Sequence, residues 1–164
     1  MPDSGLVMYE EEFKLIDAEL AKLHEQANAK LTFLVDKNGQ LITNVGETKG
    51  VDTTSLASLT AGNIAATGGM AKLLGQKEFS ILFHEGDRDN IHISVIGQRI
   101  ILVVIFDQRS SLGLVRLRAK KATDVLVKLF EEIFAKVEKE RGVKHVVKSP
   151  FAEITEEDIE KLFG

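Results

Sequence analysis

The chain has no cysteine, no tryptophan and only two prolines among its 164 residues. Without cysteine it forms neither a disulfide framework nor a thiolate metal site. No apolar run approaches the roughly 18 residues that a membrane-spanning helix needs. The longest apolar run, "IILVVIF" over residues 100–106, predicts a buried strand. The first residues also lack the basic and apolar regions of a secretory signal. We therefore expect a cytoplasmic protein with no membrane span.

The charge pattern argues against nucleic acid as a partner. The net charge is -4, and acidic and basic residues are interspersed along the chain rather than gathered on a basic face. The apolar content of 44% is that of a globular protein with a proper core. The length indicates one domain, which we place at residues 1–140, followed by a linker at 141–150 and a tail helix at 151–164.

Hydrophobic periodicity predicts three helices and five strands. Apolar residues recur at three- and four-residue spacing over 9–28 and again over 112–140, which is typical of amphipathic helices. Asn38-Gly39 between two β-rich runs within 31–46 predicts a hairpin whose two turn residues both have positive φ. The remaining predicted elements are a helix at 55–75 and strands at 78–85, 91–97 and 100–107.

These elements follow the order α-β-β-α-β-β-β-α, which indicates an α+β fold with an antiparallel sheet. The strand at 100–107 is apolar on both faces, so we expect it at the centre of the sheet. "VDTT" at 51–54 offers side-chain oxygens that would cap the helix at 55–75. The apolar residues of the tail are too few for an isolated helix, so the tail must dock on its own domain or on a partner.

The helix at 55–75, "SLASLTAGNIAATGGMAKLLG", is unusual because it holds three interior glycines, each costing about 1 kcal/mol relative to alanine. On a helical wheel the larger residues gather on one side, which we expect to cover the sheet: Leu56, Leu59, Thr60, Asn63, Thr67, Met70 and Leu74. The opposite side carries Ser58, Ala61, Gly62, Ala65, Gly68, Gly69 and Lys72. A solvated face would more often carry Glu, Lys, Gln or Arg. The small side chains therefore predict close contact with another protein chain.

Motifs for an autonomous active site are absent. No Walker-type phosphate loop and no G-x-G-x-x-G after a strand occurs, so we expect no cofactor. "HEGDRDN" at 84–90 is interpreted as a polar loop, with a metal or acid-base site as the alternative. Five basic residues follow the central strand: Arg109, Arg116, Arg118, Lys120 and Lys121. One of them could act as an arginine finger towards a GTPase, and a solvated basic flank is the alternative.

Several stretches together resemble the bacterial MglB proteins of the roadblock/LC7 superfamily. They are "LVMYEEEF", "FLVDKNGQLI", "DTTSLASLTAGN", "AKLLG", "FHEG", "LVVIFDQRSSLGLVRLRAKKA" and "SPFAEITEEDIEKLF", which run over nearly the whole chain. "TTSLASLTAGNIAA" is the most specific of these matches. The linker "KVEKERGVKHVVK" is longer and more charged than the family pattern.

The resemblance implies a five-stranded antiparallel sheet in each protomer, joined across a homodimer. It also implies that two copies bind one small Ras-like GTPase of the MglA type and accelerate its GTP hydrolysis by realigning the GTPase's own catalytic residues. The setting would be cell polarity and gliding motility, with clustering at a cell pole. A non-catalytic adaptor that scaffolds a GTPase or polarity complex is the alternative.

By the same resemblance, the GTPase-facing residues are Ala61, Ala65, Gly68, Gly69, Lys72 and Lys121. The tail helix implies a further contact with the GTPase that modulates nucleotide exchange, through Phe151, Ile154, Ile159, Leu162 and Phe163. No catalytic residue and no metal ligand is expected in this chain.

Overall fold

The computed structural model describes residues 10–147, and the side-chain surroundings of residues 10–139. Its elements are, in order, α2 (Glu10–Gln26), β1 (Leu31–Asp36), β2 (Leu41–Gly46), α3 (Thr53–Leu73), β3 (Ile81–His84), β4 (Asn90–Ile96), β5 (Ile100–Phe106) and α4 (Leu112–Val147). This order confirms the predicted α+β arrangement. In the described part of the chain, no helix is long and apolar enough to cross a membrane.

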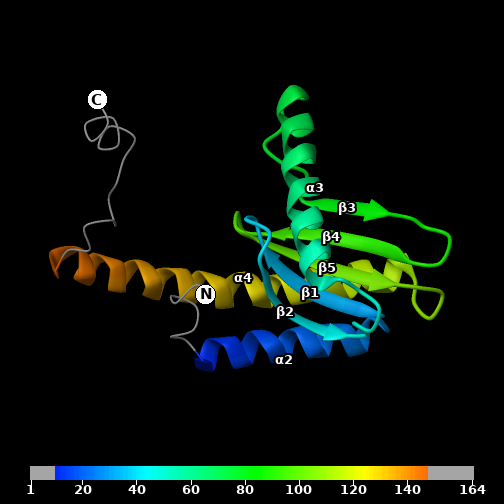
Figure 1. Ribbon diagram of the computed structural model, residues 1–164, viewed down its shortest axis with the longest axis horizontal. Helices are drawn as coiled ribbons and strands as arrows, with labels where there is room; N and C mark the ends of the chain where they lie inside the picture. Colours follow the sequence, from blue (N-terminus) through cyan, green and yellow to red (C-terminus); the bar gives the residue numbers. More distant parts are fainter. Residues whose placement is uncertain (1–9, 148–164) are drawn as a thin grey trace.

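The five strands form one antiparallel sheet in the order β2-β1-β5-β4-β3 (Figure 1). All seven residues of β5 are buried, since this strand has neighbours on both sides and helices over both faces. The prediction of a central strand at 100–107 is therefore confirmed. β3 lies at one edge of the sheet and pairs only with β4.

Helices cover the two faces of the sheet unequally (Figure 1). α2 and α4 lie side by side on one face, where Leu20 and Leu126 belong to a core with Leu102 and Val104. α3 alone crosses the other face, where Ile64 packs with β-strand residues such as Val103. Side chains alternate along β5 between these two cores, as the two-residue period of a strand requires. The predicted apolar stripe of α2 is buried as expected at Ile16, Leu20, Leu23 and Ala27, with Phe13 half-buried.

The predicted hairpin is present, but its turn differs from the expected type. Gly39 has φ +92, whereas Asn38 is not in the left-handed region. The carboxylate of Asp36 accepts the backbone N–H groups of Asn38 and Gln40 at 2.9 and 3.0 Å, which closes a longer loop than a two-residue turn. A side chain at position 39 would also meet Ser58 of α3, since its Cβ would lie 3.2 Å from the Ser58 Cα. Glycine therefore lets the hairpin approach α3.

α3 begins as predicted, but its rotation about its own axis is not the one expected. Asp52 caps it, because its carboxylate accepts the backbone N–H of Ser55 at 3.1 Å and the Ser55 hydroxyl at 2.6 Å. These hydrogen bonds lower the pKa of Asp52. The residues of α3 that are buried are Ala57, Thr60, Ile64 and Ala71.

The prediction that the largest side chains of α3 face the sheet is therefore wrong. Leu59, Met70 and Leu74 are 71%, 58% and 68% exposed. Two causes are visible. The small Ala57, which packs with Ile64 in the core beneath α3, lets the helix sit close to the sheet, and the C-terminal part of α3 projects past β3, where no sheet lies beneath it (Figure 1).

α4 is longer than predicted. It continues without a break to Val147, so residues 141–147 are helical where a linker was expected. This stretch holds one Arg, one Lys, one His and three Val, and its single glycine costs only about 1 kcal/mol, too little to end a long helix. The tail at 151–164 lies outside the described residues.

His92 of β4 is buried between the sheet and α4 without a hydrogen-bond partner for either ring nitrogen among the described residues. Burial, and then the positive charge of Arg116, lower the pKa of His92 from 6.5 to about 4. In the unfolded chain His92 therefore binds a proton below about pH 6.5, whereas in the folded chain it binds one only below about pH 4. As far as His92 contributes, the free energy of unfolding is highest above pH 6.5 and falls as the pH drops from 6.5 to about 4.

We expect replacement of His92 by leucine to remove that acid sensitivity. The wild-type chain should lose about 3 kcal/mol more unfolding free energy between pH 6.5 and pH 4 than His92→Leu does, at about 1.36 kcal/mol per pKa unit. Urea unfolding at several pH values measures the difference. His84→Leu, at an exposed position, is the matched control and should behave like wild type. Parallel curves for wild type and His92→Leu would show that His92 does not carry the effect.

Candidate functional site

A hollow of about 450 Å³ opens between α3 and one end of the sheet. Its floor and one wall come from α3, and the other walls come from the end of β1, the segment before β3 and the β4–β5 turn. The lining residues are Lys37, Ala61, Ile64, Ala65, Gly68, Gly69, Lys72, Lys77, Glu78 and Gln98. It is a shallow surface depression rather than an enclosed cavity.

The hollow exists because the α3 residues around it are too small to fill it. A Cβ added to Gly68 or Gly69 would meet nothing within 4 Å outside its own helix backbone. By contrast, Ser58 and Ala61 lie against the hairpin, where Ala61 Cβ would be 3.7 Å from a Cβ at Gly39. The small side of α3 therefore has two uses. Its N-terminal part accommodates the chain's own hairpin, and the part around Ala65, Gly68 and Gly69 stays open.

The rim of the hollow is basic. Lys37 and Glu78 form an ion pair at 2.9 Å across one wall. Lys72 is exposed on α3 and Lys77 is exposed just after it, and neither forms an ion pair with any described residue. Three lysines against one glutamate favour an acidic surface as the occupant.

The structure brings five of the six predicted GTPase-facing residues together. Ala61, Ala65, Gly68, Gly69 and Lys72 all line the hollow. Lys121 does not, because it lies on α4, on the opposite face of the sheet (Figure 1). The five predicted tail contacts, Phe151 to Phe163, lie outside the described residues.

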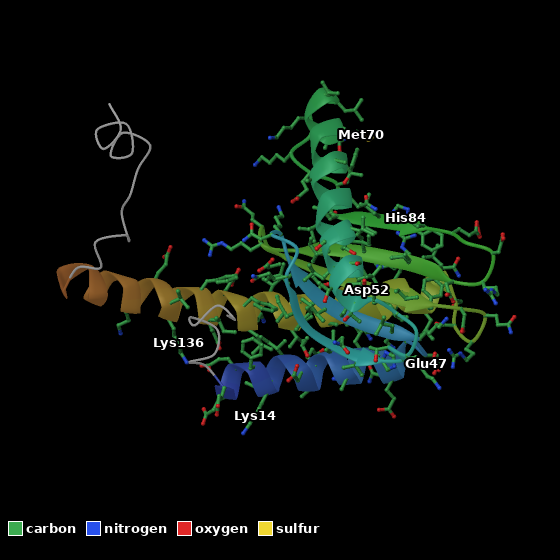
Figure 2. The ribbon with its side chains drawn as sticks, in the orientation of Figure 1. Lys14, Glu47, Asp52, Met70, His84 and Lys136 are labelled. Carbon is green, nitrogen blue, oxygen red and sulfur yellow. The ribbon has the colours of Figure 1, made fainter. Side chains whose placement is uncertain are left out.

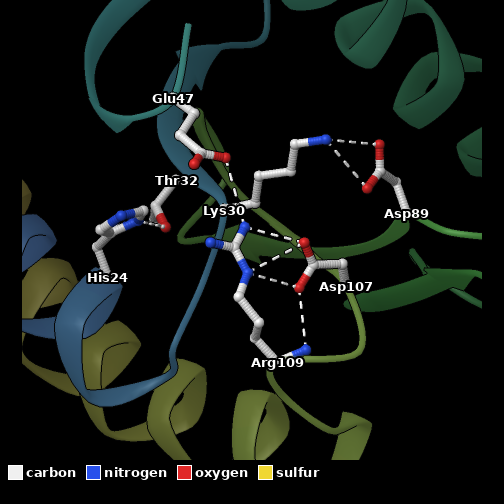
Figure 3. Close-up of polar contacts among 7 residues, drawn as sticks. All are labelled: His24, Lys30, Thr32, Glu47, Asp89, Asp107 and Arg109. Carbon is white, nitrogen blue, oxygen red and sulfur yellow. Dashed lines mark hydrogen bonds and ion pairs between the residues drawn. The ribbon is translucent and has the colours of Figure 1, made fainter.

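Arg109, a candidate arginine finger, is held by carboxylates of its own chain (Figure 3). Its Nε donates to Asp107 Oδ1 at 3.0 Å and its Nη2 to Asp107 Oδ2 at 2.9 Å, and Glu47 lies 3.4 Å from the same Nη2. This guanidinium holds the pKa of Asp107 at about 2. Arg109 also lies near the start of β1, because Asp107 directly follows β5 and the end of β5 pairs with the start of β1. The hollow is at the other end of β1, beside Lys37.

The polar loop after β3 is tied to other parts of the chain. Nδ2 of Asn63 on α3 lies 3.1 Å from Nε2 of His84. Asp89 forms an ion pair with Lys30 at 3.1 Å, drawn in Figure 3. Among the described side chains, those of residues 10–139, no three His, Asp or Glu are grouped as metal ligands would be. The contacts fit the interpretation as a structural loop.

The sequence interpretation missed the walls of the hollow. Lys37 directly follows β1, and Gln98 lies in the turn between β4 and β5. Lys77 and Glu78 belong to the segment before β3. Lys37 and Gln98 meet because β1 and β5 are paired, with the Lys37 N–H donating to the carbonyl of Arg99 at 3.0 Å. No local pattern signals such a meeting, because it depends on which strands become neighbours in the sheet.

Comparison with known proteins gives a consistent result. The family model described as "Roadblock/LC7 domain" matches residues 15–106. MglB from Myxococcus xanthus is 61% identical, with a TM-score of 0.70 over 71% of this chain and 95% of that chain. A gliding protein MglB from Thermus thermophilus is 31% identical, with a TM-score of 0.71 over 74% of this chain and 92% of that chain. An MglB structure with a tetrameric arrangement is 29% identical, with a TM-score of 0.70 over the same shares of the two chains. A comparison with curated sequences gave no match.

Proposed function

The chain belongs to the roadblock/LC7 family, and from this premise we propose that it activates a small Ras-like GTPase of the MglA type while acting as a homodimer. Cell polarity and gliding motility, with clustering at a cell pole, form the proposed setting. The proposal includes the contact of the tail, residues 151–164, with the same GTPase. Lys121 would contact that GTPase on the face of the sheet covered by α4, whereas the hollow lies on the face covered by α3.

The observation that carries this proposal is the open, basic-rimmed hollow along α3. A helix that accepts several glycines without any contact from its own chain gains nothing from them in the isolated protomer. The arrangement makes sense when another backbone lies against Ala65, Gly68 and Gly69, because small residues permit that approach. The lysines of the rim would face acidic residues of the GTPase.

Activation without a catalytic residue follows from differential binding. If the hollow fits the hydrolysis-competent conformation of the GTPase better than the resting one, binding shifts the population towards the competent conformation. A tenfold acceleration needs only about 1.4 kcal/mol of preference for that state. The GTPase then supplies the groups that position the attacking water. This chain supplies the surface that favours the conformation in which those groups are aligned.

A single-turnover assay on the cognate GTPase tests this function. GTP hydrolysis is followed with the GTPase alone and with this protein in excess, alongside a binding measurement on the GTP-loaded form. Faster hydrolysis supports the activator. Tight binding with an unchanged rate would instead support the non-catalytic adaptor.

The proposed homodimer would use the edge of the sheet at β3. This strand leaves one side of its backbone unpaired and exposes Ile81 and Phe83, at 51% and 39%. The projecting end of α3 adds Met70, Leu73 and Leu74, and Figure 2 shows Met70 on the part of α3 beyond β3. An apolar edge strand beside an apolar helix end is an unstable surface in isolation, and a second copy would cover it.

We expect the double substitution Ile81→Lys and Leu73→Lys to produce monomers. Two lysines would place like charges in a desolvated interface, weakening association at least a hundredfold, about 2.7 kcal/mol. Sedimentation equilibrium measures the effect. Leu15→Lys, at a leucine 55% exposed on α2, is the matched control and should remain dimeric. Dimers that survive the double substitution would place the interface elsewhere.

A further inference from the structure

One ion pair in the wall of the hollow joins two segments that the sheet keeps apart. Lys37 directly follows β1 and Glu78 lies before β3, and Lys37 Nζ donates to Glu78 Oε1 at 2.9 Å. β5 and β4 lie between β1 and β3 in the sheet, so the two residues do not belong to neighbouring strands. The two side chains therefore meet across the end of the sheet, beside the β4–β5 turn.

The backbone of Lys37 is held in place at this end of the sheet. Its N–H donates to the carbonyl of Arg99 in the β4–β5 turn at 3.0 Å. The guanidinium of Arg99 lies 4.7 Å from the centre of the Phe134 ring, a cation–π contact that holds the turn against α4. Because the backbone of Lys37 is anchored in this way, only its side chain is free to turn to another partner.

The ion pair itself is exchangeable. Both side chains line the hollow, with 37% of Lys37 and 29% of Glu78 exposed. An ion pair this open to water contributes little to the stability of the fold, since water solvates both charges. A carboxylate of a binding partner would give the Lys37 ammonium the same charged hydrogen bond that Glu78 gives it. Replacing Glu78 by such a carboxylate therefore costs little.

Glu78 is the one acidic residue among those that line the hollow, where the cations are Lys37, Lys72 and Lys77. It repels any acidic surface that enters the hollow, because binding brings like charges together. A partner recovers this loss only when one of its carboxylates reaches Lys37 Nζ. Glu78 thus lowers the affinity of acidic surfaces in general and favours a partner with a carboxylate at this place.

We propose that Lys37 is a recognition residue of the hollow and that Glu78 is its counter-ion in the free protein, which a carboxylate of the GTPase displaces on binding. This inference rests on the proposed function, because the partner is the same GTPase at the same hollow. It identifies the cation that the partner's carboxylate contacts, and it makes Glu78 the residue that sets the selectivity of the hollow.

A titration of the GTP-loaded GTPase with the variant Glu78→Gln tests the displacement. We expect the affinity to rise at least threefold, because the substitution frees Lys37 and removes a like charge facing the partner. The gain should shrink as salt is raised. Glu25→Gln is the matched control: it changes the net charge equally, but Glu25 is exposed on α2 and does not line the hollow, so its affinity should stay that of wild type. Unchanged or weaker binding by Glu78→Gln would overturn the proposal.

Exchanging the two residues separates recognition from mere fastening of the wall. Lys37→Glu with Glu78→Lys keeps the net charge and both partners of the ion pair, but it moves the cation to the other side of the wall. We expect this variant to bind at least tenfold more weakly, about 1.4 kcal/mol, while circular dichroism shows it folded. Affinity equal to wild type would mean that the ion pair only fastens the wall, and the role of Lys37 in recognition would be excluded.

The Ala65→Arg variant shows which hypothesis has failed. Ala65 lines the hollow and takes no part in the ion pair. A wild-type protein that binds no GTP-loaded GTPase, or full binding by Ala65→Arg, would remove the hollow as the GTPase site and this inference with it. Binding that is lost in Ala65→Arg but unchanged in Glu78→Gln and in the exchanged variant would remove only the role of Lys37 and Glu78.

Discussion

Arginine in place of Ala65 or Gly69 is expected to abolish binding of the GTPase and, with it, any acceleration of GTP hydrolysis. Both residues line the hollow, and both are exposed on α3, so the larger side chain is accommodated by the protomer itself. It would fill the space that we assign to the GTPase backbone and add a cation to a rim that is already basic. We expect a loss of affinity of at least a hundredfold, about 2.7 kcal/mol, in a titration with the GTP-loaded GTPase.

Ala66→Arg is the matched control for this experiment. Ala66 is also an exposed alanine of α3, but it does not line the hollow. It should bind and activate as wild type does, and all three variants should remain folded, which circular dichroism checks. Full stimulation by Ala65→Arg and Gly69→Arg would remove the hollow as the GTPase site while leaving family membership untouched.

We expect the three interior glycines of α3 to lower the free energy of unfolding relative to alanine. Gly62, Gly68 and Gly69 have room for a Cβ within the protomer, because none of them would bring it within 4 Å of a neighbouring atom. Alanine at each position should raise the unfolding free energy by about 0.5–1 kcal/mol, so the triple variant should gain about 1.5–3 kcal/mol. Urea unfolding at one protein concentration measures the gain. A triple variant no more stable than wild type would mean that the glycines serve the folded assembly, for example through contact with the second copy.

The place of each glycine on α3 determines whether we expect it to contribute to GTPase binding as well. Gly68 and Gly69 line the hollow, whereas Gly62 is exposed elsewhere on α3. We expect Gly68→Ala and Gly69→Ala to weaken GTPase binding, and Gly62→Ala to stabilise the chain without that loss. Equal affinity in all three single variants would show that the hollow tolerates added methyl groups and does not require close backbone contact.

Much of the fold was predictable because local patterns determine it. The apolar stripe of α2, the buried run of β5 and the Asp52 cap all follow from the identity and spacing of nearby residues. The small residues around Ala65 and Gly69 were also visible in the sequence, because their size is unusual for a helix. The rotation of α3 about its own axis was not predictable, because a helical wheel centred on Leu59 and Met70 assumes that the sheet lies beneath the whole helix.

Local pattern also could not determine the extent of α4 or the partners of the basic residues. Residues 141–147 continue α4 because a single glycine is too weak to end it. Arg109 is engaged by Glu47 and Asp107, and Glu47 comes from a segment more than sixty residues earlier. Such a pair exists only once β1 and β5 are neighbours.

The sequence by itself determined the order of helices and strands, the central place of residues 100–106 and the small, glycine-bearing side of α3. These properties depend on side-chain size, polarity and period along a few turns or strands. Only the tertiary structure decided that this side divides into a part that accepts the hairpin and a part that opens as a hollow. It also decided that Lys37, Lys77 and Gln98 surround the hollow while Lys121 lies across the sheet. The reason is physical: these residues are positioned by the pairing order of the strands and by the face on which each helix packs, and no short stretch of sequence contains that information.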